Sequence, residues 1–180
     1  KRFLTQFGII IGGYVSSIGE VQTNFGDMPF EERFIRAEES DVRCPIESSA
    51  SKMRAEIEKT IHGKNTLGGI VEIVALNLPI GLGSFVQWDK RLEAKLALAV
   101  MSVQAIKGVE VGDAFEHATR IGTQAHDPIN LQPSTFTLRR ASNRAGGIEG
   151  GISNGQPIVI RAAMKPIATT LLSQPTVDLA

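Results

Sequence analysis

The sequence has a single cysteine, no long apolar run and no excess of charge of either sign. The lone Cys44 excludes an internal disulfide framework and any zinc cluster built from cysteines, and it fits a reducing cytoplasm. Because no run of about 18 apolar residues occurs, we expect no membrane-spanning helix. The 19 Lys and Arg residues balance the 19 Asp and Glu residues, so nothing indicates a nucleic acid or an anionic membrane as a partner.

The remaining composition is typical of a globular protein. Hydrophobic residues make up 42% of the 180 residues, which predicts one domain over residues 1–180 with a substantial core. The chain begins Lys1-Arg2 without an initiator methionine or a signal-peptide pattern, so we expect a truncated chain. An intentional truncation and a proteolytic product would look the same.

Apolar and β-branched stretches predict several strands. We expect strands at residues 9–18, 69–78, 106–111, 135–139 and 156–164. Gly12-Gly13 interrupts the first of them, at a bulge or a close backbone contact. Strands and helices do not alternate strictly, which favours an α+β fold over a doubly wound sheet.

Two helices are predicted between these strands. Serines at 48, 49 and 51 offer N-caps for one helix, which places Met53, Ile57 and Ile61 on an apolar stripe and ends near residue 63. The second helix would be capped by Asp89, and its buried face would carry Leu92, Leu96, Ala99 and Val103. Residues 22–47 are expected to form a long surface excursion and residues 120–135 a loop.

Residues 142–155 contain five glycines among fourteen residues. Glycine tolerates positive φ and lets the backbone approach a ligand closely. The segment matches neither the dinucleotide fingerprint nor a phosphate loop. From the residues alone, a ligand-binding loop and a tight structural turn are both open.

Four strings carry a family resemblance. They are VRCP at 42–45, MSVQAIKGVEVG at 101–112, SNRAGGIEGGISNGQPI at 142–158 and KPIAT at 165–169. In this order and spacing they closely resemble the chorismate synthases. At 64–69 the chain reads Lys-Asn-Thr-Leu-Gly-Gly, where that family commonly has Gly-Asp-Ser-x-Gly-Gly.

The resemblance implies a fold and an activity. The expected fold is a β-α-β sandwich with antiparallel sheets packed on a helical layer, here truncated. The expected enzyme is a carbon–oxygen lyase that converts 5-enolpyruvylshikimate 3-phosphate to chorismate by anti-1,4-elimination of phosphate. It requires reduced FMN, belongs to the shikimate pathway of aromatic amino-acid biosynthesis and is a cytoplasmic homotetramer. An associated flavin reductase activity, which would use NADPH, is left open.

The resemblance also implies which residues contact FMN. Lys165 is a cation that could meet the FMN phosphate, and Thr169 could donate a hydroxyl to it. Without the resemblance, Gln104 would be interpreted as a surface residue and Lys165 as a solvated lysine at a strand end. The complete set is Gln104, Ala105, Gly150, Lys165, Pro166, Ile167, Ala168 and Thr169.

No catalytic residue and no metal ligand is expected within the chain. The two catalytic histidines of the family, its first signature and its Arg-x-Asp signature have no counterpart in residues 1–180. His126-Asp127 resembles a His-Asp pair that lies near the cofactor in the family, with a local turn role as the alternative. The alternative function is a folded, self-associating fragment that is not catalytic.

Overall fold

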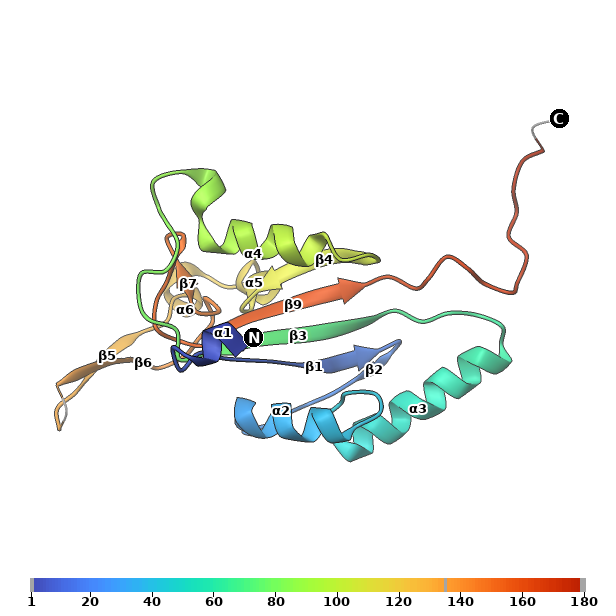
Figure 1. The fold of residues 1–180 in the computed structure, drawn as a ribbon, viewed down its shortest axis with the longest axis horizontal. Helices are drawn as coiled ribbons and strands as arrows, with labels where there is room; N and C mark the ends of the chain where they lie inside the picture. Colours follow the sequence, from blue (N-terminus) through green and yellow to red (C-terminus); the bar gives the residue numbers. More distant parts are fainter. Residues whose placement is uncertain (1, 135, 179–180) are drawn as a thin grey trace. The chain divides into compact units, whose positions relative to one another are not determined.

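The computed structural model describes residues 2–134 and 136–178. Figure 1 shows its helices and strands along the chain. The helices are α1 (Arg2–Thr5), α2 (Phe30–Glu39), α3 (Glu47–His62), the 3-10 turn η1 (Trp88–Lys90), α4 (Leu92–Met101), α5 (Ala114–His117) and α6 (Gly122–Ala125). The strands are β1 (Ile10–Ile18), β2 (Val21–Gln22), β3 (Gly69–Leu76), β4 (Ile106–Val111), β5 (Ile129–Gln132), β6 (Thr137–Arg140), β7 (Ile148–Glu149), β8 (Ile152–Ser153) and β9 (Ile158–Met164).

The main sheet has five strands in the order β2-β1-β3-β9-β4. The Gly19 amide, just after β1, donates to the Gly68 carbonyl just before β3, so these two strands are antiparallel. The Gly112 amide, just after β4, donates to the Val159 carbonyl at the start of β9, which gives the same relation. Two separate hairpins, β5–β6 and β7–β8, are antiparallel as well. The predicted α+β fold with antiparallel sheets is confirmed.

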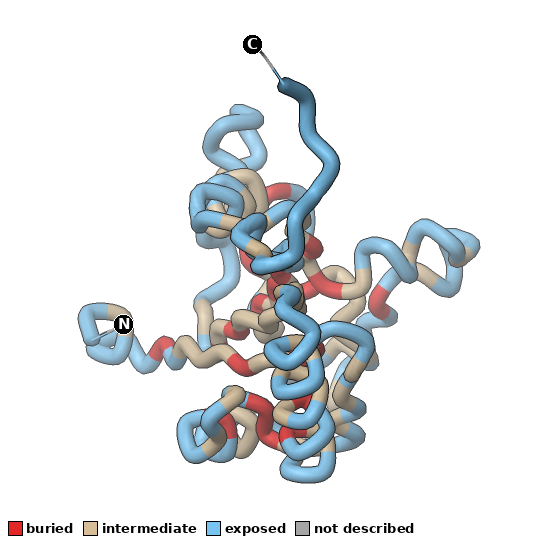
Figure 2. Tube along the Cα trace, turned by 90° about the vertical axis from the view of Figure 1, so that its right-hand side faces the viewer, coloured by how far each residue is buried: buried red, intermediate tan, exposed pale blue. Residues whose placement is uncertain are grey.

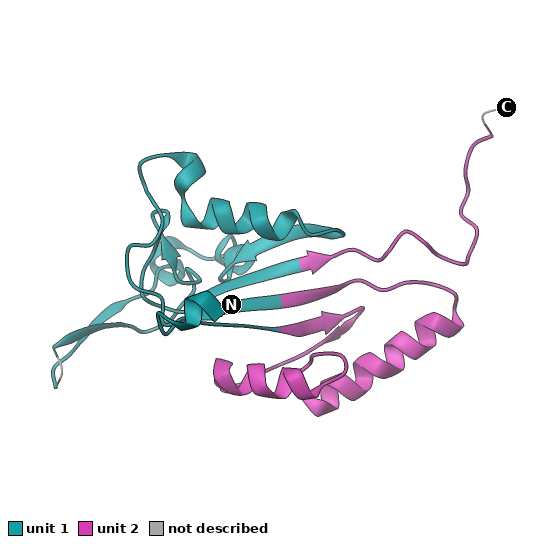
Figure 3. Cartoon of the chain, viewed as in Figure 1, with its two compact units in different colours: residues 1–13, 72–162 teal, residues 14–71, 163–180 magenta. Residues whose placement is uncertain are grey.

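The chain divides into two compact units, coloured separately in Figure 3. The first unit comprises residues 1–13 and 72–162, and the second comprises residues 14–71 and 163–180. Strands β1, β3 and β9 each have residues in both units. A single domain over residues 1–180 stays a prediction.

The core of the first unit lies between α4 and the sheet. Three isoleucines, Ile148, Ile158 and Ile160, are buried, and Leu92, Leu96 and Val100 of α4 pack against them. The predicted face of α4 was therefore right for Leu92 and Leu96. It was wrong for two positions, because Ala99 and Val103 are exposed and Val100 takes the inward position.

The core of the second unit lies under α3. Cys44, Ala50 and Met53 are buried together there, with Val15 and Ile18 of β1 packed against them. The predicted stripe on α3 is correct at its start, since Met53 is fully buried, but Ile61 at the end of the helix is 65% exposed. A buried aromatic residue of β1, Tyr14, packs against Phe25 and Phe34 and accepts a hydrogen bond from Arg33 of α2 at 2.9 Å.

Both predicted helix starts were wrong. The helix α3 begins at Glu47, before any of the serines, and no side chain caps it. Asp89 lies within the 3-10 turn η1, and α4 begins after Arg91, again without a side-chain cap. In both cases an extended residue, Ile46 or Arg91, precedes the helix, so backbone geometry sets the start.

Three short elements contradict the predicted loops. The helix α2 lies within the expected excursion at 22–47; its apolar residues Phe30, Phe34 and Ala37 recur at helical spacing among charged residues, so a periodic signal was present and was missed. The expected loop at 120–135 contains α6 and β5, both of which are only four residues long. The strand predicted at 135–139 is β6, whereas Thr135 lies outside the described residues.

The other predicted strands are confirmed. β1, β3, β4 and β9 fall within the predicted ranges to within two residues at each end. Gly13 makes the close contact expected in β1, since a Cβ there would lie 3.2 Å from the Glu72 carbonyl oxygen. Beyond β9 the chain is exposed almost throughout (Figure 2).

Candidate functional site

Residues 165–169 directly follow β9 and belong to the second unit. All five side chains are exposed. Within residues 2–134 and 136–178, no carboxylate or hydrogen-bond partner engages the Lys165 ammonium group. A cation of this kind is free to bind an anion such as a phosphate.

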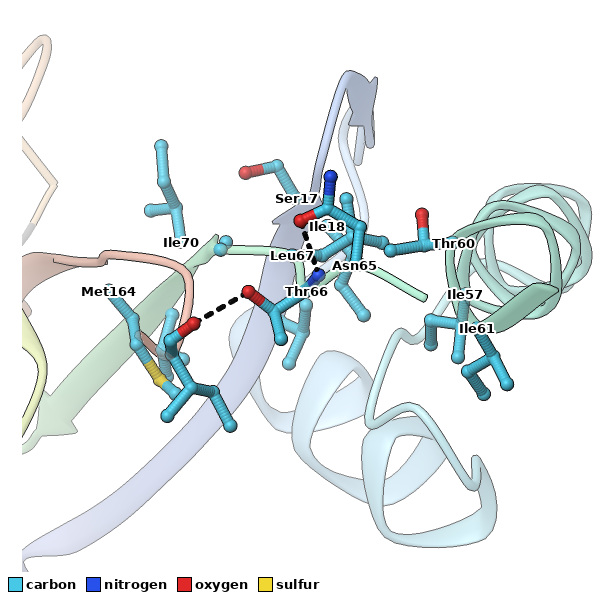
Figure 4. A pocket seen from close by; sticks show the side chains of 15 residues that line it. Ser17, Ile18, Ile57, Thr60, Ile61, Asn65, Thr66, Leu67, Ile70 and Met164 are labelled. Carbon is cyan, nitrogen blue, oxygen red and sulfur yellow. Dashed lines mark hydrogen bonds between the residues drawn. The ribbon is translucent and has the colours of Figure 1, made fainter. Parts of the chain in front are cut away.

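A turn at residues 64–67 is hydrogen-bonded to the segment that follows β9. Lys64 has a φ of 54°, in the left-handed region. The Asn65 side-chain oxygen accepts a hydrogen bond from the Thr66 amide at 2.9 Å, and the Thr66 hydroxyl donates to the Ile167 carbonyl at 2.7 Å. Both bonds are drawn in Figure 4. The turn thus joins two segments that are 101 residues apart.

Two glycines complete the turn. A Cβ on Gly68 would collide with the Met164 carbonyl oxygen, and a Cβ on Gly69 would collide with the Ser17 carbonyl oxygen. Neither position has room for a side chain. The close backbone approach, and not a left-handed φ, is what requires glycine here.

An apolar cavity of about 390 Å³ opens beside this turn, entirely within the second unit. Figure 4 shows Ile57, Ile61, Leu67, Ile70 and Met164 around it. The volume lies within the range typical of small-molecule sites, and few polar groups line it. Lys165 lies in sequence between two lining residues, Met164 and Ile167.

Gln104 and Ala105 lie in the first unit, between α4 and β4. The Gln104 side chain is exposed. Ala105 has a φ of 69°, which costs a residue with a Cβ about 1–2 kcal/mol. Strain of this kind is concentrated at functional sites, although it does not identify the function by itself.

Gly150 forms the turn of the β7–β8 hairpin together with Gly151. Their φ values are 61° and 92°, as expected for a two-residue hairpin turn with both central residues left-handed. A Cβ on Gly151 would lie 2.7 Å from the Ser84 carbonyl oxygen, whereas a Cβ on Gly150 would meet nothing within 4 Å. This part of the segment thus forms a tight turn, while ligand binding by the segment stays a prediction, and the surface above Gly150 is open.

Gln104 and Gly150 lie at opposite ends of α4. The Leu92 amide, at the start of this helix, donates to the Gly151 carbonyl at 2.9 Å. Gln104 follows the last residue of the helix, Met101. Ten helical residues span about 15 Å. A ligand that touches both positions in one copy of the chain has to be extended.

Asp127 organises the beginning of the glycine-rich segment. Its carboxylate is buried and accepts hydrogen bonds from the Ser142 hydroxyl at 2.5 Å, the Arg144 amide at 2.8 Å and the Ala145 amide at 3.0 Å. Desolvation alone would raise the pKa of Asp127, but these three hydrogen bonds and the nearby charge of Arg140 outweigh it and lower the pKa. The neighbouring His126 is exposed.

An ion-pair group on the sheet escaped the sequence reasoning. Arg161 of β9 donates to Glu110 of β4 at 2.8 Å and lies 3.8 Å from the Glu72 carboxylate of β3. Both glutamates are largely buried, and the Phe115 amide also donates to Glu110 at 2.9 Å. Two acidic residues within otherwise apolar strands were the signal that could have revealed this group.

Two kinds of feature are absent from the described residues. Across residues 2–134 and 136–178, no group of three or more His, Cys, Asp or Glu side chains is arranged to hold a metal ion. Among those residues, no helix combines the length and the apolar character that crossing a membrane requires.

Comparison with known proteins identifies the family. The family model described as chorismate synthase matches residues 1–180. The chain belongs to the chorismate synthase family.

Individual relatives agree with this assignment. The chain is 48% identical to a chorismate synthase of Sulfurihydrogenibium sp. over 95% of its own length, which is 44% of that protein. It is 47% identical to the chorismate synthase of Thermobifida fusca over 99% of its length and 45% of that protein. A crystal structure of a chorismate synthase superimposes with a TM-score of 0.85 at 43% identity, covering 92% of this chain and 52% of the other. The chain thus spans slightly less than half of these curated relatives.

The residues that depart from the pattern Gly-Asp-Ser-x-Gly-Gly at 64–69 are chemically compatible with it. Lys64 adopts a left-handed φ, which glycine adopts readily. The Asn65 side-chain oxygen accepts a hydrogen bond from the Thr66 amide, which an aspartate oxygen can also accept, and Thr66 carries a hydroxyl as serine does. The acidic charge of the pattern is lost.

Proposed function

We propose that this chain is the flavin-binding portion of a chorismate synthase that converts 5-enolpyruvylshikimate 3-phosphate to chorismate with reduced FMN. The observation that carries the proposal is the exposed Lys165 ammonium, which has no partner among the described residues and lies in a segment that borders an apolar cavity. A cation beside an apolar space suits a ligand with a phosphate and a flat hydrophobic ring. The resemblance to the chorismate synthases is the reason for proposing FMN as that ligand.

The residues present fit the phosphate end of FMN. Lys165 would neutralise the phosphate, and Thr169 would donate its hydroxyl to it. Pro166, Ile167 and Ala168 would shape the turn against the cavity. Gln104, Ala105 and Gly150 are the other proposed contacts, with Gly150 offering open backbone.

The chemistry that reduced FMN supplies when bound is a transient electron for the departure of phosphate in the 1,4-elimination. The tasks of this chain are to bind the cofactor, hold its orientation and exclude water from the apolar side. The groups that transfer protons and grip the substrate would come from outside residues 1–180. We further propose that the complete enzyme is a cytoplasmic homotetramer.

A second candidate function is a folded, self-associating piece without catalysis. The observation that favours it is length, because the chain spans only 44% to 46% of several chorismate synthases that it matches. Under this alternative, the fold would form but phosphate elimination would not occur.

Anaerobic titration of the chain with reduced FMN measures binding. Addition of 5-enolpyruvylshikimate 3-phosphate, with the absorbance of chorismate recorded, then tests for activity. The Kd for FMN should rise about tenfold or more in Lys165→Ala, because one charge-assisted contact is lost. The matched control is Lys52→Ala, which removes an exposed lysine on α3 and leaves the affinity unchanged. Equal affinity of wild type and Lys165→Ala would overturn the proposed site. A folded, self-associating chain that binds no FMN would favour the second candidate, whereas formation of chorismate would show that residues 1–180 suffice for catalysis.

A further inference from the structure

The segment after β9 is held by few bonds. Pro166 has no amide hydrogen, and residues 165–170 pair with no strand. The Leu171 amide donates to the Lys64 carbonyl at 3.1 Å, and the Thr66 hydroxyl donates to the Ile167 carbonyl at 2.7 Å. Both bonds come from the turn at 64–67.

Of these two bonds, only the one from Thr66 uses a side chain. It acts in the middle of the 165–169 segment, two residues from both Lys165 and Thr169. The Leu171 bond acts beyond the segment. The orientation of the proposed phosphate-binding side chains therefore depends on the Thr66 hydroxyl.

We propose that Thr66 is a positioning residue for the FMN site. Its hydroxyl fixes the Ile167 carbonyl and so sets the direction in which Lys165 and Thr169 point. Thr66 itself makes no contact with the phosphate. This inference rests on the proposed function, because it assumes that residues 165–169 bind the cofactor.

Preorganisation supplies the physical reason. A flexible segment has to be ordered when a ligand binds, and this ordering lowers the affinity. A bond that orders the segment beforehand removes part of that cost. A hydroxyl at position 66 is sufficient for this role. Serine at this position should therefore keep the function of threonine, whereas the isosteric valine, which has no hydroxyl, should lose it.

Three variants test the role of Thr66 in FMN binding. Thr66→Val should raise the Kd for FMN about fivefold to tenfold, the effect of one neutral hydrogen bond. Thr66→Ser should restore the wild-type Kd to within about twofold, since the donor is kept. Thr123→Val is the matched control, because it makes the same change of hydroxyl to methyl at an exposed position of α6 that does not line the cavity and does not bond Ile167. Its Kd should stay unchanged.

Hydrogen exchange at the Leu171 amide gives a readout that does not need FMN. Exchange should be faster in Thr66→Val than in wild type, and Thr66→Ser should restore the slow rate. Unchanged exchange in Thr66→Val would overturn the inference. So would faster exchange with an unchanged FMN affinity, provided that Lys165→Ala still weakens binding.

The failure of the proposed function looks different. In that case the wild-type chain binds no FMN, or Lys165→Ala binds it as tightly as wild type does. Either result removes the ligand from this segment, and the role of Thr66 in binding is overturned with it. Weakened binding in both Lys165→Ala and Thr66→Val, with rescue by serine, supports both proposals.

Discussion

The Asp127 carboxylate accepts a hydrogen bond from the Ser142 hydroxyl at 2.5 Å, across fifteen residues of chain. The same carboxylate accepts bonds from the Arg144 and Ala145 amides. The Asp127 carboxylate therefore fixes the first residues of the glycine-rich segment. The β7–β8 hairpin and its turn residue Gly150 follow directly along the chain. A residue that the sequence places beside an exposed histidine turns out to be a buried support of the site region.

Loss of this charge should destabilise the protein. Asp127→Asn removes the charge and one acceptor oxygen while keeping the size of the side chain, and should lower the free energy of unfolding by about 2 kcal/mol at pH 7. Urea unfolding followed by circular dichroism measures this. Asp27→Asn, a change at an exposed position, is the control and should stay within about 0.5 kcal/mol of wild type. Equal stability of Asp127→Asn and wild type would contradict the anchoring role.

The contribution of Asp127 should depend on pH with a defined sign. Hydrogen bonds lower the pKa of Asp127 in the folded chain below its unfolded value of about 3.9, so the stabilisation is complete above that value. It is lost as pH falls through the folded pKa. The difference in unfolding free energy between wild type and Asp127→Asn should therefore be constant from about pH 5 to 7 and shrink below about pH 4. A difference that grows on acidification would show that the sign is wrong.

The Arg161–Glu110 pair should show a favourable coupling. Glu110→Ala leaves the Phe115 amide without its acceptor and Arg161 with only the more distant Glu72. The single variants Glu110→Ala and Arg161→Ala and their combination form a double-mutant cycle. Because Arg161 is partly exposed, we expect a coupling of about 1 kcal/mol from urea unfolding. A coupling of zero would mean that the two charges act independently.

Two glycines with the same backbone angle should respond differently to alanine. Gly112 and Gly150 have φ values of 60° and 61°. Gly150→Ala meets no neighbour within 4 Å and should cost only the left-handed strain, about 1–2 kcal/mol. Gly112→Ala collides in addition with the Arg144 carbonyl and the Gly146 amide, and should cost about 3 kcal/mol or more. Thermal unfolding compares the two, and equal losses would count against the close packing at Gly112.

Much of the fold follows from local patterns. The strands β1, β3 and β9 are mostly apolar and rich in β-branched residues, and β4 alternates apolar and polar residues, both of which are typical of strands. The fourfold spacing on α3 predicts a helix with one apolar stripe. The elements α6 and β5 have only four residues each, too few for a periodic signal, which is why the sequence predicts a loop there. In α2 the apolar positions Phe30, Phe34 and Ala37 are at helical spacing, but the surrounding charged residues led to the prediction of a surface excursion.

By itself, the sequence determined the family, through four ordered strings, and the positions of the main strands, through their apolar composition. Only the tertiary structure decided which residues support the candidate site. It joins Thr66 to Ile167 and Asp127 to Ser142, and it separates Gln104 from Gly150 by the length of α4. The physical reason is that strand and helix preferences act over neighbouring residues, whereas a hydrogen bond across 101 residues exists only once the chain has folded.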